Sequence, residues 1–374
     1  MTQRVFVGMS GGVDSSLTAA LLVEQGYDVT GVYMKNWSQD LPGMQCPWAE
    51  DLADAKRVAV QLGIDFIVFD FEHDYKHKVV DYMLAEYQAG RTPNPDIMCN
   101  QEIKFRLFLD TARERGADLI ATGHYAQTGD ACAGDSNAAT GQEHSFQPDR
   151  LYRAIDVAKD QTYFLYRVTS DALQYTLFPL GGYTKQQVRY MASERGLWTA
   201  RKQESMGVCF VGNVGMRDFL SQYVSTRPGD IIDKQTGVVL GRHDGAIFYT
   251  LGQRHGLDVG GGLPYYVVGK DMAANVVYVS RNMNDEAMWC HDVLVGDLHW
   301  IHGAPAADDQ LTVRLRHRGQ LRQCTLQYNP TQAQAQATLH LSDPERAVAA
   351  GQSAVIYRGT ECLGGGIVVD SVAL

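Results

Sequence analysis

The sequence has no excess of basic residues, because 33 Lys and Arg face 43 Asp and Glu and leave a formal net charge of −10. A phosphate backbone is usually bound by a basic surface, so this balance argues against a nucleic-acid partner. The sequence also has no apolar run of the roughly 20 residues that span a membrane, and no charged N-terminal region followed by a long apolar stretch. We therefore expect a cytoplasmic protein with no membrane segment.

Disulfide and metal-binding patterns are missing as well. The seven cysteines form an odd set with no CxxC pair and no Cys/His cluster at zinc spacing. This argues against a disulfide scaffold and a structural zinc site. In a reducing compartment the default role of each cysteine is that of a small buried hydrophobe. A catalytic role can therefore be inferred only from the sequence context of a particular cysteine.

What the sequence does contain is an alternation of strand and helix patterns near its N-terminus. Apolar β-type runs predict strands at 4–9, 28–35, 65–71 and 118–122, and the spacing between them predicts helices at 15–25, 50–62, 73–89 and 100–115. Such alternation is typical of an α/β fold with a doubly wound parallel sheet, whose ligands bind beyond the carboxyl ends of the strands. Site residues should therefore directly follow strands.

The remainder of the chain contains a polar loop and many short β-type runs. Residues 129–149 are small and polar, with four acidic residues and no Lys or Arg, and we expect a surface loop there. Short β-type runs then predict strands at 229–232, 237–240, 246–249, 265–268 and 276–280, and at least five more after 291 predict a small barrel. The expected domains are an α/β domain at 1–202, a small central β-rich domain at 203–290 and a C-terminal β-barrel at 291–374.

Four arginines, Arg314, Arg316, Arg318 and Arg322, fall within nine residues that contain no acid, with His317 among them. On a strand these arginines would share one face. A solvated sheet face and a contact with a polyanion fit this pattern equally well.

The string Ser10-Gly11-Gly12-Val13-Asp14-Ser15-Ser16 follows the first expected strand and opens the first helix. Its glycines allow close backbone approach, its serines offer hydroxyls, and the free N–H groups of the helix start favour a phosphate. It has no lysine, so it is not the GxxxxGK[ST] phosphate loop. It resembles the pyrophosphate loop of the ATP pyrophosphatase family, whose members cleave ATP between the α- and β-phosphates. In that role Asp14 would help to hold Mg²⁺; otherwise it is a first-turn carboxylate that complements the helix dipole.

Two cysteines stand out by context. Cys99 follows a loop that Pro95 interrupts and lies at or near the start of an expected helix, a position that lowers a thiol pKa. Cys209 lies in the string KQESMGVCF, where the α/β pattern gives way to β-rich sequence. Taken separately, each is explained better by packing than by chemistry.

Six motifs occur in the order GMSGGVDSS, TPNPDIMCNQEIKF, ATGHYA, KDQTYFL, KQESMGVCF and YTLGQRHGL. Together they resemble the bacterial tRNA-specific 2-thiouridylase family over nearly the whole chain. The resemblance implies an ATP pyrophosphatase domain, a central domain and a tRNA-binding barrel. It also implies ATP-dependent replacement of the C2 oxygen of the wobble uridine by sulfur, in the anticodon arm of glutamine, glutamate and lysine tRNAs. A sulfur-relay protein would donate the persulfide.

The resemblance also implies roles for particular residues. Cys209 would carry the persulfide, Cys99 would be the nucleophile that completes sulfur release and leaves a Cys99–Cys209 disulfide, and Asp96 would be an acid/base group or else a Pro-Asp turn residue. ATP would be held by Gly8, Met9, Ser10, Gly11, Gly12, Val13, Asp14, Ser15, Met34 and Gly123. The tRNA would be contacted by Asn94, Pro95, Asp96, His124, Lys159, Asp160, Gln161, Arg316, His317 and Gln352.

Two other interpretations stay open. A pyrophosphatase-family enzyme that adenylates a small metabolite would explain the SGGVDSS loop, but neither cysteine nor the arginine-rich segment. A protein that only binds nucleotide and RNA would fit if both cysteines were inert. Under the tRNA interpretation, the net charge of −10 predicts weak non-specific binding, so recognition would rest on a few local contacts.

Overall fold

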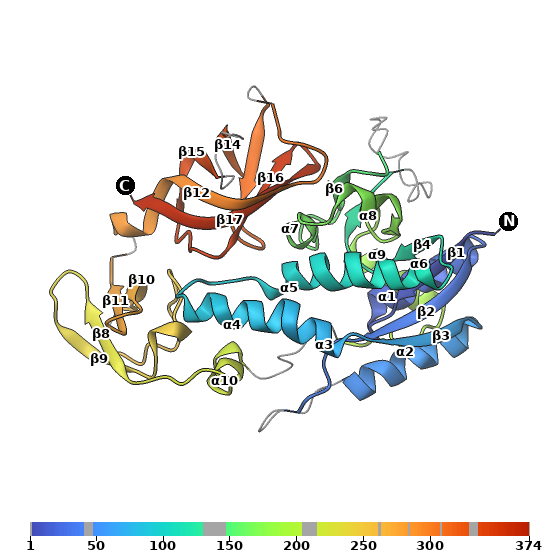
Figure 1. Ribbon diagram of the computed structural model, residues 1–374, viewed down its shortest axis with the longest axis horizontal. Coiled ribbons are helices and arrows are strands. Elements are labelled where there is room, and N and C mark those ends of the chain that lie inside the picture. The colour runs from blue at the N-terminus through green and yellow to red at the C-terminus, as the bar shows by residue number, and fades with distance from the viewer. Residues whose placement is uncertain are drawn as a thin grey trace.

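The computed structural model describes residues 2–40, 48–129, 147–203, 215–260, 263–282, 285–306, 309–328 and 336–373. Cys209 and most of the expected acidic loop, residues 130–146, lie outside the described residues. Figure 1 shows an α/β unit, a small central β unit and a C-terminal barrel, with two long helical rods extending from the α/β unit toward the central unit. None of the helices in these ranges is long and apolar enough to cross a membrane.

The N-terminal unit is built on a parallel sheet with the strand order β3-β2-β1-β4-β7. Its strands are β1 (Arg4–Gly8), β2 (Asp28–Lys35), β3 (Asp65–Asp70), β4 (Leu119–Ala121) and β7 (Thr176–Leu177). The doubly wound parallel sheet predicted from the sequence is confirmed. The two-residue strand β7 was not predicted, because so short a run carries no periodicity.

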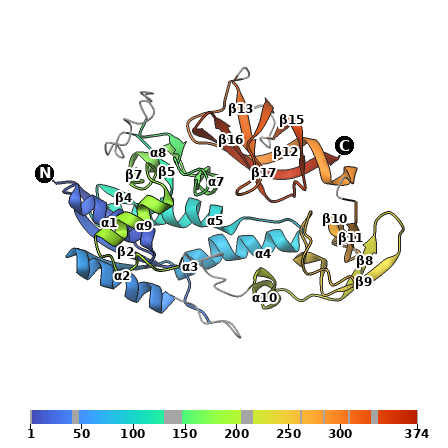
Figure 2. The ribbon, with the colours of Figure 1, turned by 180° about the vertical axis from the view of Figure 1, so that it is seen from behind.

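Helices cover both faces of this sheet. Along β1, Val5 and Val7 face one core and Phe6 faces the other, as the period of two along a strand requires. One face is covered by α1 (Val13–Glu24), α2 (Trp48–Leu62) and α9 (Lys185–Glu194), and Figure 2 shows α9 beside α1. The other is covered by two rods made of α3 (Glu72–Tyr75), η1 (Lys76–Val80) and α4 (Asp81–Gln88), and of α5 (Pro95–Met98), η2 (Cys99–Leu107) and α6 (Phe108–Glu114).

A short segment of the N-terminal unit joins the C-terminal sheet. Strands β5 (Ala126–Gln127) and β6 (Leu151–Arg153) pair with each other, and β6 pairs with β17 (Glu361–Ala373) of the barrel. The helices α7 (Thr162–Leu165) and α8 (Ser170–Gln174) follow. Strands β5 and β6 of the N-terminal unit and the C-terminal barrel strands therefore belong to one continuous sheet.

The central unit contains α10 (Met216–Ser221) and a sheet of the order β10-β11-β8-β9. The strands are β8 (Gly229–Asp233), β9 (Val239–His243), β10 (Tyr266–Asp271) and β11 (Val276–Ser280). The strand expected at 246–249 is wrong, because residues Ala246–Phe248 form a 3₁₀ turn, η5. Ala246 and Ile247 are buried there, and an apolar run this short does not distinguish a strand from a helical turn.

Six antiparallel strands close the C-terminal barrel in the order β12-β15-β14-β13-β16-β17, with β17 returning to β12. A 3₁₀ turn, η6 (Glu286–Met288), precedes them. The strands are β12 (Trp289–Trp300), β13 (Leu311–Arg314), β14 (Arg322–Tyr328), β15 (Ala337–Arg346), β16 (Ser353–Arg358) and β17 (Glu361–Ala373). The predicted barrel is confirmed.

The prediction that four arginines share one strand face is wrong. Strand β13 ends at Arg314, which is buried, and the chain then turns, with the N–H of Gly319 donating to the carbonyl of Arg316 at 2.9 Å. Arg318 has a left-handed φ of 60°, and Arg322 begins the next strand. The alternation of side chains between the two faces of a strand therefore does not continue through residues 314–322.

Candidate functional site

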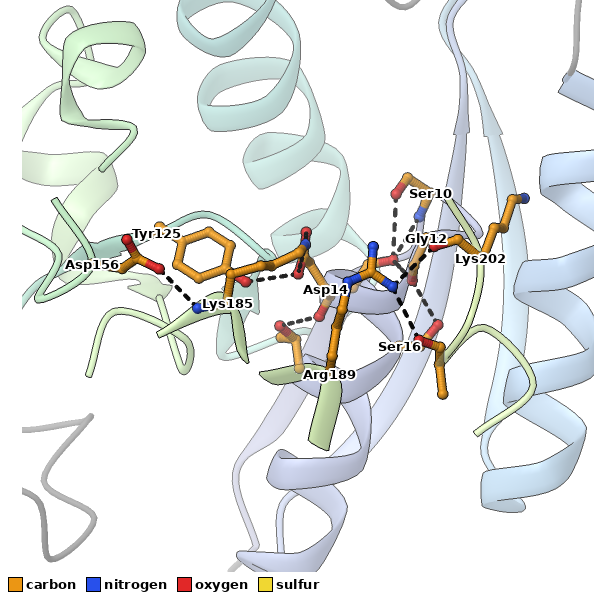
Figure 3. A network of polar contacts seen from close by, with 12 residues as sticks. Ser10, Gly12, Asp14, Ser16, Tyr125, Asp156, Lys185, Arg189 and Lys202 are labelled. Carbon is orange, nitrogen blue, oxygen red and sulfur yellow. Dashed lines mark hydrogen bonds and ion pairs between the residues drawn. The ribbon is translucent and has the colours of Figure 1, made fainter. Parts of the chain in front are cut away.

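The loop between β1 and α1 is closed by hydrogen bonds with serines in the first turn of α1. The carbonyl of Gly12 accepts hydrogen bonds from the N–H of Ser16 at 3.2 Å, from Ser15 Oγ at 3.2 Å and from Ser16 Oγ at 2.8 Å. The N–H of Ser10 donates to Ser15 Oγ at 3.1 Å. The loop therefore holds a fixed shape at the carboxyl end of β1 (Figure 3).

Two glycines allow the close contacts on which this shape depends. Gly11 has a left-handed φ of +74°, and a Cβ there would lie 2.3 Å from the carbonyl oxygen of Asp51. A Cβ on Gly123, just after β4, would lie 2.8 Å from the backbone nitrogen of Ser15. The start of α1 thus touches the end of β4, and the predicted nucleotide residues of both strands meet in one place.

The other predicted nucleotide residues lie at the same edge of the sheet. Met34 is near the end of β2, and its Cε lies 3.0 Å from the position that a Cβ on Gly8 would take. Met9 and Val13 are buried beneath the loop. The structure brings these residues together, and their contacts with ATP stay predictions.

Lys185 supplies the cation that the loop itself lacks. Its Nζ donates to Asp14 Oδ1 at 2.7 Å and to Oδ2 at 2.8 Å, and Tyr125 Oη donates to Asp14 Oδ1 at 2.9 Å. Lys185 is the first residue of α9, which Thr184 caps, and Asp156 accepts the backbone N–H of Lys185 at 2.8 Å. Figure 3 shows the side chain reaching across to the loop.

Sequence reasoning missed Lys185. It is 171 residues from Asp14, so spacing carried no signal. The Thr-Lys pair that opens a capped helix was the only clue.

A second lysine lies on the side of the loop away from Lys185 (Figure 3). Lys202 Nζ donates to Asp51 Oδ1 at 2.8 Å and to Asp54 Oδ2 at 2.7 Å, and Arg189 donates to the carbonyl of Lys202 at 3.2 Å. These contacts anchor the segment just before residue 204 beside the loop. Residues up to 203 are therefore held beside the predicted nucleotide loop.

The residues around the loop are compatible with Mg²⁺. Magnesium is usually bound by one or two carboxylates together with substrate phosphates, rather than by a cage of protein ligands. Asp14 is a carboxylate in the first turn of α1 and is about one-third exposed, and no group of three or more potential metal-ligating side chains occurs in the described part of the chain. The donor set thus fits a metal held mainly by phosphates.

Cys99 lies one turn inside its helix. Asn94 caps α5 by accepting the N–H of Asp96 at 3.1 Å, Pro95 is the first helical residue, and the N–H of Cys99 already donates to the carbonyl of Pro95. Cys99 is only 3% exposed and belongs to the core beneath the sheet. The predicted position near a helix start is confirmed, although the free N–H groups belong to the residues before it.

Asp96 lies on the first turn of the same helix and is half-buried. Burial raises the pKa of its carboxyl above the usual range, and Lys104 partly opposes this shift. A raised pKa suits a carboxyl that exchanges a proton.

His124, predicted to contact tRNA, is buried between two aromatic rings. Its centroid lies 5.5 Å from that of Phe105 and 6.2 Å from that of Phe178, and its Nδ1 shares a 2.8 Å hydrogen bond with Thr122 Oγ1. Burial holds the pKa of His124 well below its usual value, with a smaller contribution from Lys104. The ring is therefore neutral at physiological pH.

The predicted Lys159-Asp160-Gln161 contact is largely internal. Asp160 is buried and bonds to Arg153 at 3.1 Å and to Arg314 at 3.0 Å, and Gln161 Oε1 accepts the N–H of Tyr125 at 2.9 Å. Lys159 is half-buried. Contact of these residues with tRNA stays a prediction.

The three barrel residues predicted to contact tRNA occupy two turns. Arg316 donates to Glu345 at 3.2 Å and remains about half exposed. His317 packs against Phe164 with ring centroids 4.5 Å apart, and burial lowers its pKa, with help from neighbouring arginines. The backbone of Gln352 bonds to Val368 at 2.7 Å. Arg316 and His317 thus lie where the barrel meets α7.

Three family models match consecutive parts of the chain: the tRNA methyl transferase HUP domain at residues 3–213, the tRNA methyl transferase PRC-barrel domain at 217–281 and the aminomethyltransferase beta-barrel domain at 290–368. Among solved structures, a 4-thiouridine synthetase–RNA complex with bound ATP is 16% identical and covers 59% of this chain and 50% of that chain. Its TM-score of 0.36 is too low to support an argument.

Curated relatives match nearly the whole chain. The tRNA-specific 2-thiouridylase MnmA of Enterococcus faecalis is 43% identical over 370 residues, covering 98% of this chain and 95% of that protein. The protein of the same name from Bacillus subtilis is 42% identical over 370 residues, with the same coverage. Such identity along almost the full length of both proteins, across all three domains, shows that the chain belongs to the tRNA-specific 2-thiouridylase family.

Proposed function

We propose that this protein is an ATP-dependent tRNA-uridine 2-sulfurtransferase. It adenylates the C2 oxygen of the wobble uridine in glutamine, glutamate and lysine tRNAs, and a cysteine persulfide then delivers sulfur to give 2-thiouridine, AMP and pyrophosphate. The proposed domains are the adenylation domain at 1–202, the central domain with the persulfide cysteine at 203–290 and the tRNA-binding barrel at 291–374. The reaction takes place in the cytoplasm.

The observation that carries the nucleotide half of this proposal is the closed serine loop at the carboxyl end of β1, with Lys185 directed at its Asp14. A helix start with free N–H groups and a nearby ammonium stabilises phosphate charge. The residues from Gly8 to Ser15, with Met34 and Gly123, would hold ATP. Mg²⁺, held by Asp14 and the phosphates, would neutralise charge that develops during transfer.

Adenylation solves the problem of the leaving group. The uracil C2 oxygen attacks the α-phosphorus, the bond between the α-phosphorus and the bridging oxygen breaks, and pyrophosphate departs. The oxygen at C2 then leaves as part of AMP, which is a far better leaving group than oxide. Chemistry at a base also requires the base to leave its stack, and an anticodon loop makes this inexpensive. Asn94, Pro95 and Asp96 would receive the base.

Sulfur transfer would use both cysteines. The terminal sulfur of the Cys209 persulfide attacks C2 and AMP leaves. The Cys99 thiolate then attacks Sγ of Cys209, the bond between the two persulfide sulfurs breaks, and 2-thiouridine is released with a Cys99–Cys209 disulfide. A thiol reductant restores the two cysteines and a sulfur-relay protein reloads Cys209, while Asp96 exchanges the proton needed at Cys99.

One assay tests the proposal against its rivals. The protein is incubated with ATP, Mg²⁺, a low-molecular-weight persulfide as the sulfur donor and unmodified glutamate tRNA, and the products are AMP and a tRNA whose migration is retarded in a mercury-containing gel. AMP without retarded tRNA would favour the rival enzyme that adenylates a small metabolite, and the absence of both products would favour a protein that only binds. Only the two products together support the proposal.

A further inference from the structure

Asp160 is a buried carboxylate whose two oxygens are both fully engaged. Its Oδ2 accepts from Arg153 Nε at 3.1 Å and from an Arg314 guanidinium N–H at 3.0 Å. Its Oδ1 accepts from the N–H of Thr162 at 3.2 Å and from Thr162 Oγ1 at 2.8 Å. The side chain of Asp160 is 0% exposed and that of Arg314 is 6% exposed. The pair joins the N-terminal unit to the last residue of β13, and it leaves the carboxylate closed to an RNA ligand.

One chain of contacts leads from this pair to Cys99. Thr162 begins α7, and two residues later the carbonyl of Phe164 accepts from Asn100 Nδ2 at 3.0 Å. Asn100 is buried and directly follows Cys99. The position of the Cys99 helix is therefore tied to α7, and α7 is tied to the barrel through Asp160.

A second chain of contacts leads to the nucleotide loop. Gln161 Oε1 accepts the N–H of Tyr125 at 2.9 Å, and Tyr125 Oη donates to Asp14 at 2.9 Å. The segment formed by Asp160, Gln161 and Thr162 is thus connected to the barrel, to the loop and to the helix that carries Cys99.

We propose that Asp160 is a positioning residue that holds the Cys99 helix and the nucleotide loop in register with the barrel, so that one bound tRNA presents its base to both chemical steps. This inference rests on the proposed function. It differs from a direct role of Asp160 in binding tRNA, because a lost phosphate or base contact would raise the KM for tRNA. Lost positioning would instead lower kcat.

The test is the steady-state thiolation of glutamate tRNA by Asp160→Asn, with Asp171→Asn, an exposed carboxylate on α8, as the matched control. We expect kcat to fall about tenfold or more in Asp160→Asn while the KM for tRNA changes by less than about twofold. Arg314→Gln should behave in the same way, and Arg314→Lys should retain most of kcat because it keeps the charge opposite Asp160. A raised KM at unchanged kcat, or wild-type kcat in Asp160→Asn, would overturn the inference.

Breaking a buried ion pair leaves an uncompensated charge and can prevent folding. The Asp160→Asn/Arg314→Gln double variant removes both charges of this pair and leaves only the partly exposed Arg153 without its carboxylate, and we expect it to show the same loss of kcat at unchanged KM. Wild-type kcat in the double variant would count against positioning.

A readout independent of catalysis separates this inference from the proposed function. Because Cys99 is buried, iodoacetamide should label it slowly in the wild-type protein and several-fold faster in Asp160→Asn, as measured by mass spectrometry of the Cys99 peptide. Equal labelling rates would contradict positioning even if thiolation is normal. A wild-type protein that makes no 2-thiouridine would contradict the proposed function alone.

Discussion

Lys185 and Asp14 lie 171 residues apart in the sequence, and the ammonium of Lys185 is 2.7 Å and 2.8 Å from the two carboxylate oxygens of Asp14. The lysine side chain is 13% exposed and the aspartate side chain 31% exposed. The pair is therefore largely shielded from solvent. In the proposed function, the ammonium would turn from the carboxylate to the phosphates of ATP, and Asp14 would become available to Mg²⁺.

Lys185→Gln should therefore impair the use of ATP. We expect kcat/KM for ATP to fall by about a hundredfold, the usual consequence of removing a donor that stabilises developing charge. Pyrophosphate release in the presence of tRNA measures it. Lys56→Gln, which removes an exposed lysine from α2, is the control and should leave kcat/KM unchanged. Equal values of kcat/KM for ATP in the two variants would show that Lys185 has no role in the use of ATP.

Gly123→Ala tests the contact between β4 and the loop. The added Cβ would lie 2.8 Å from the backbone nitrogen of Ser15, so either the loop or the strand end must move. We expect a loss of about 1–3 kcal/mol in the free energy of unfolding and a fall of at least about tenfold in AMP formation. Gly260→Ala is the control, because nothing lies within 4 Å of its Cβ position. Urea denaturation and AMP assays distinguish the two variants, and a fully active Gly123→Ala would show that the contact is dispensable.

The elements around this loop were predictable because their signals are local. Strand β2 (Asp28–Lys35) has the bounds expected from its apolar run, and β1 ends one residue earlier than expected. The glycines and serines before the helix start predict an anion site, because the N–H groups that would bind the anion belong to this segment itself. Local pattern was sufficient to place these strands and the loop, and anion binding by the loop stays a prediction.

What could not be predicted depends on contacts between distant segments. Lys185 reaches the loop because α9 packs beside α1, and the buried Asp160 is paired with Arg314, which comes from another unit. A single sequence carries no signal for such pairings.

Replacing either proposed catalytic cysteine should abolish thiolation. In Cys99→Ser and Cys209→Ser we expect 2-thiouridine to fall below detection, because a hydroxyl neither carries a persulfide nor attacks one. Cys324→Ala is the control: its thiol is buried in the barrel core, and burial raises its pKa to about 12, so it holds no thiolate at neutral pH. Mercury-gel analysis of the tRNA measures the product. Normal 2-thiouridine in either serine variant would rule out the two-cysteine mechanism.

Asp96→Asn should change folding stability and thiolation activity in opposite directions, and the change in stability should depend on pH. Because burial raises the pKa of Asp96, the protonated carboxyl is the form that the folded state favours. The stability it confers is present below the usual aspartate pKa of about 3.9 and is lost as pH rises through the raised folded-state pKa.

The neutral amide introduced by Asp96→Asn does not ionise, so the variant would not lose folding stability as the pH rises. Relative to the wild type, the variant should therefore gain in free energy of unfolding between about pH 4 and pH 8, while its thiolation activity falls because the proton-exchanging group is gone. Urea denaturation at the two pH values measures the first effect, and the exposed Asp171→Asn serves as the control without a pH-dependent gain. If Asp96→Asn lost stability relative to the wild type as pH rose, the carboxylate would be favoured by its surroundings, and Asp96 would be a helix-start residue rather than a group held ready to exchange a proton.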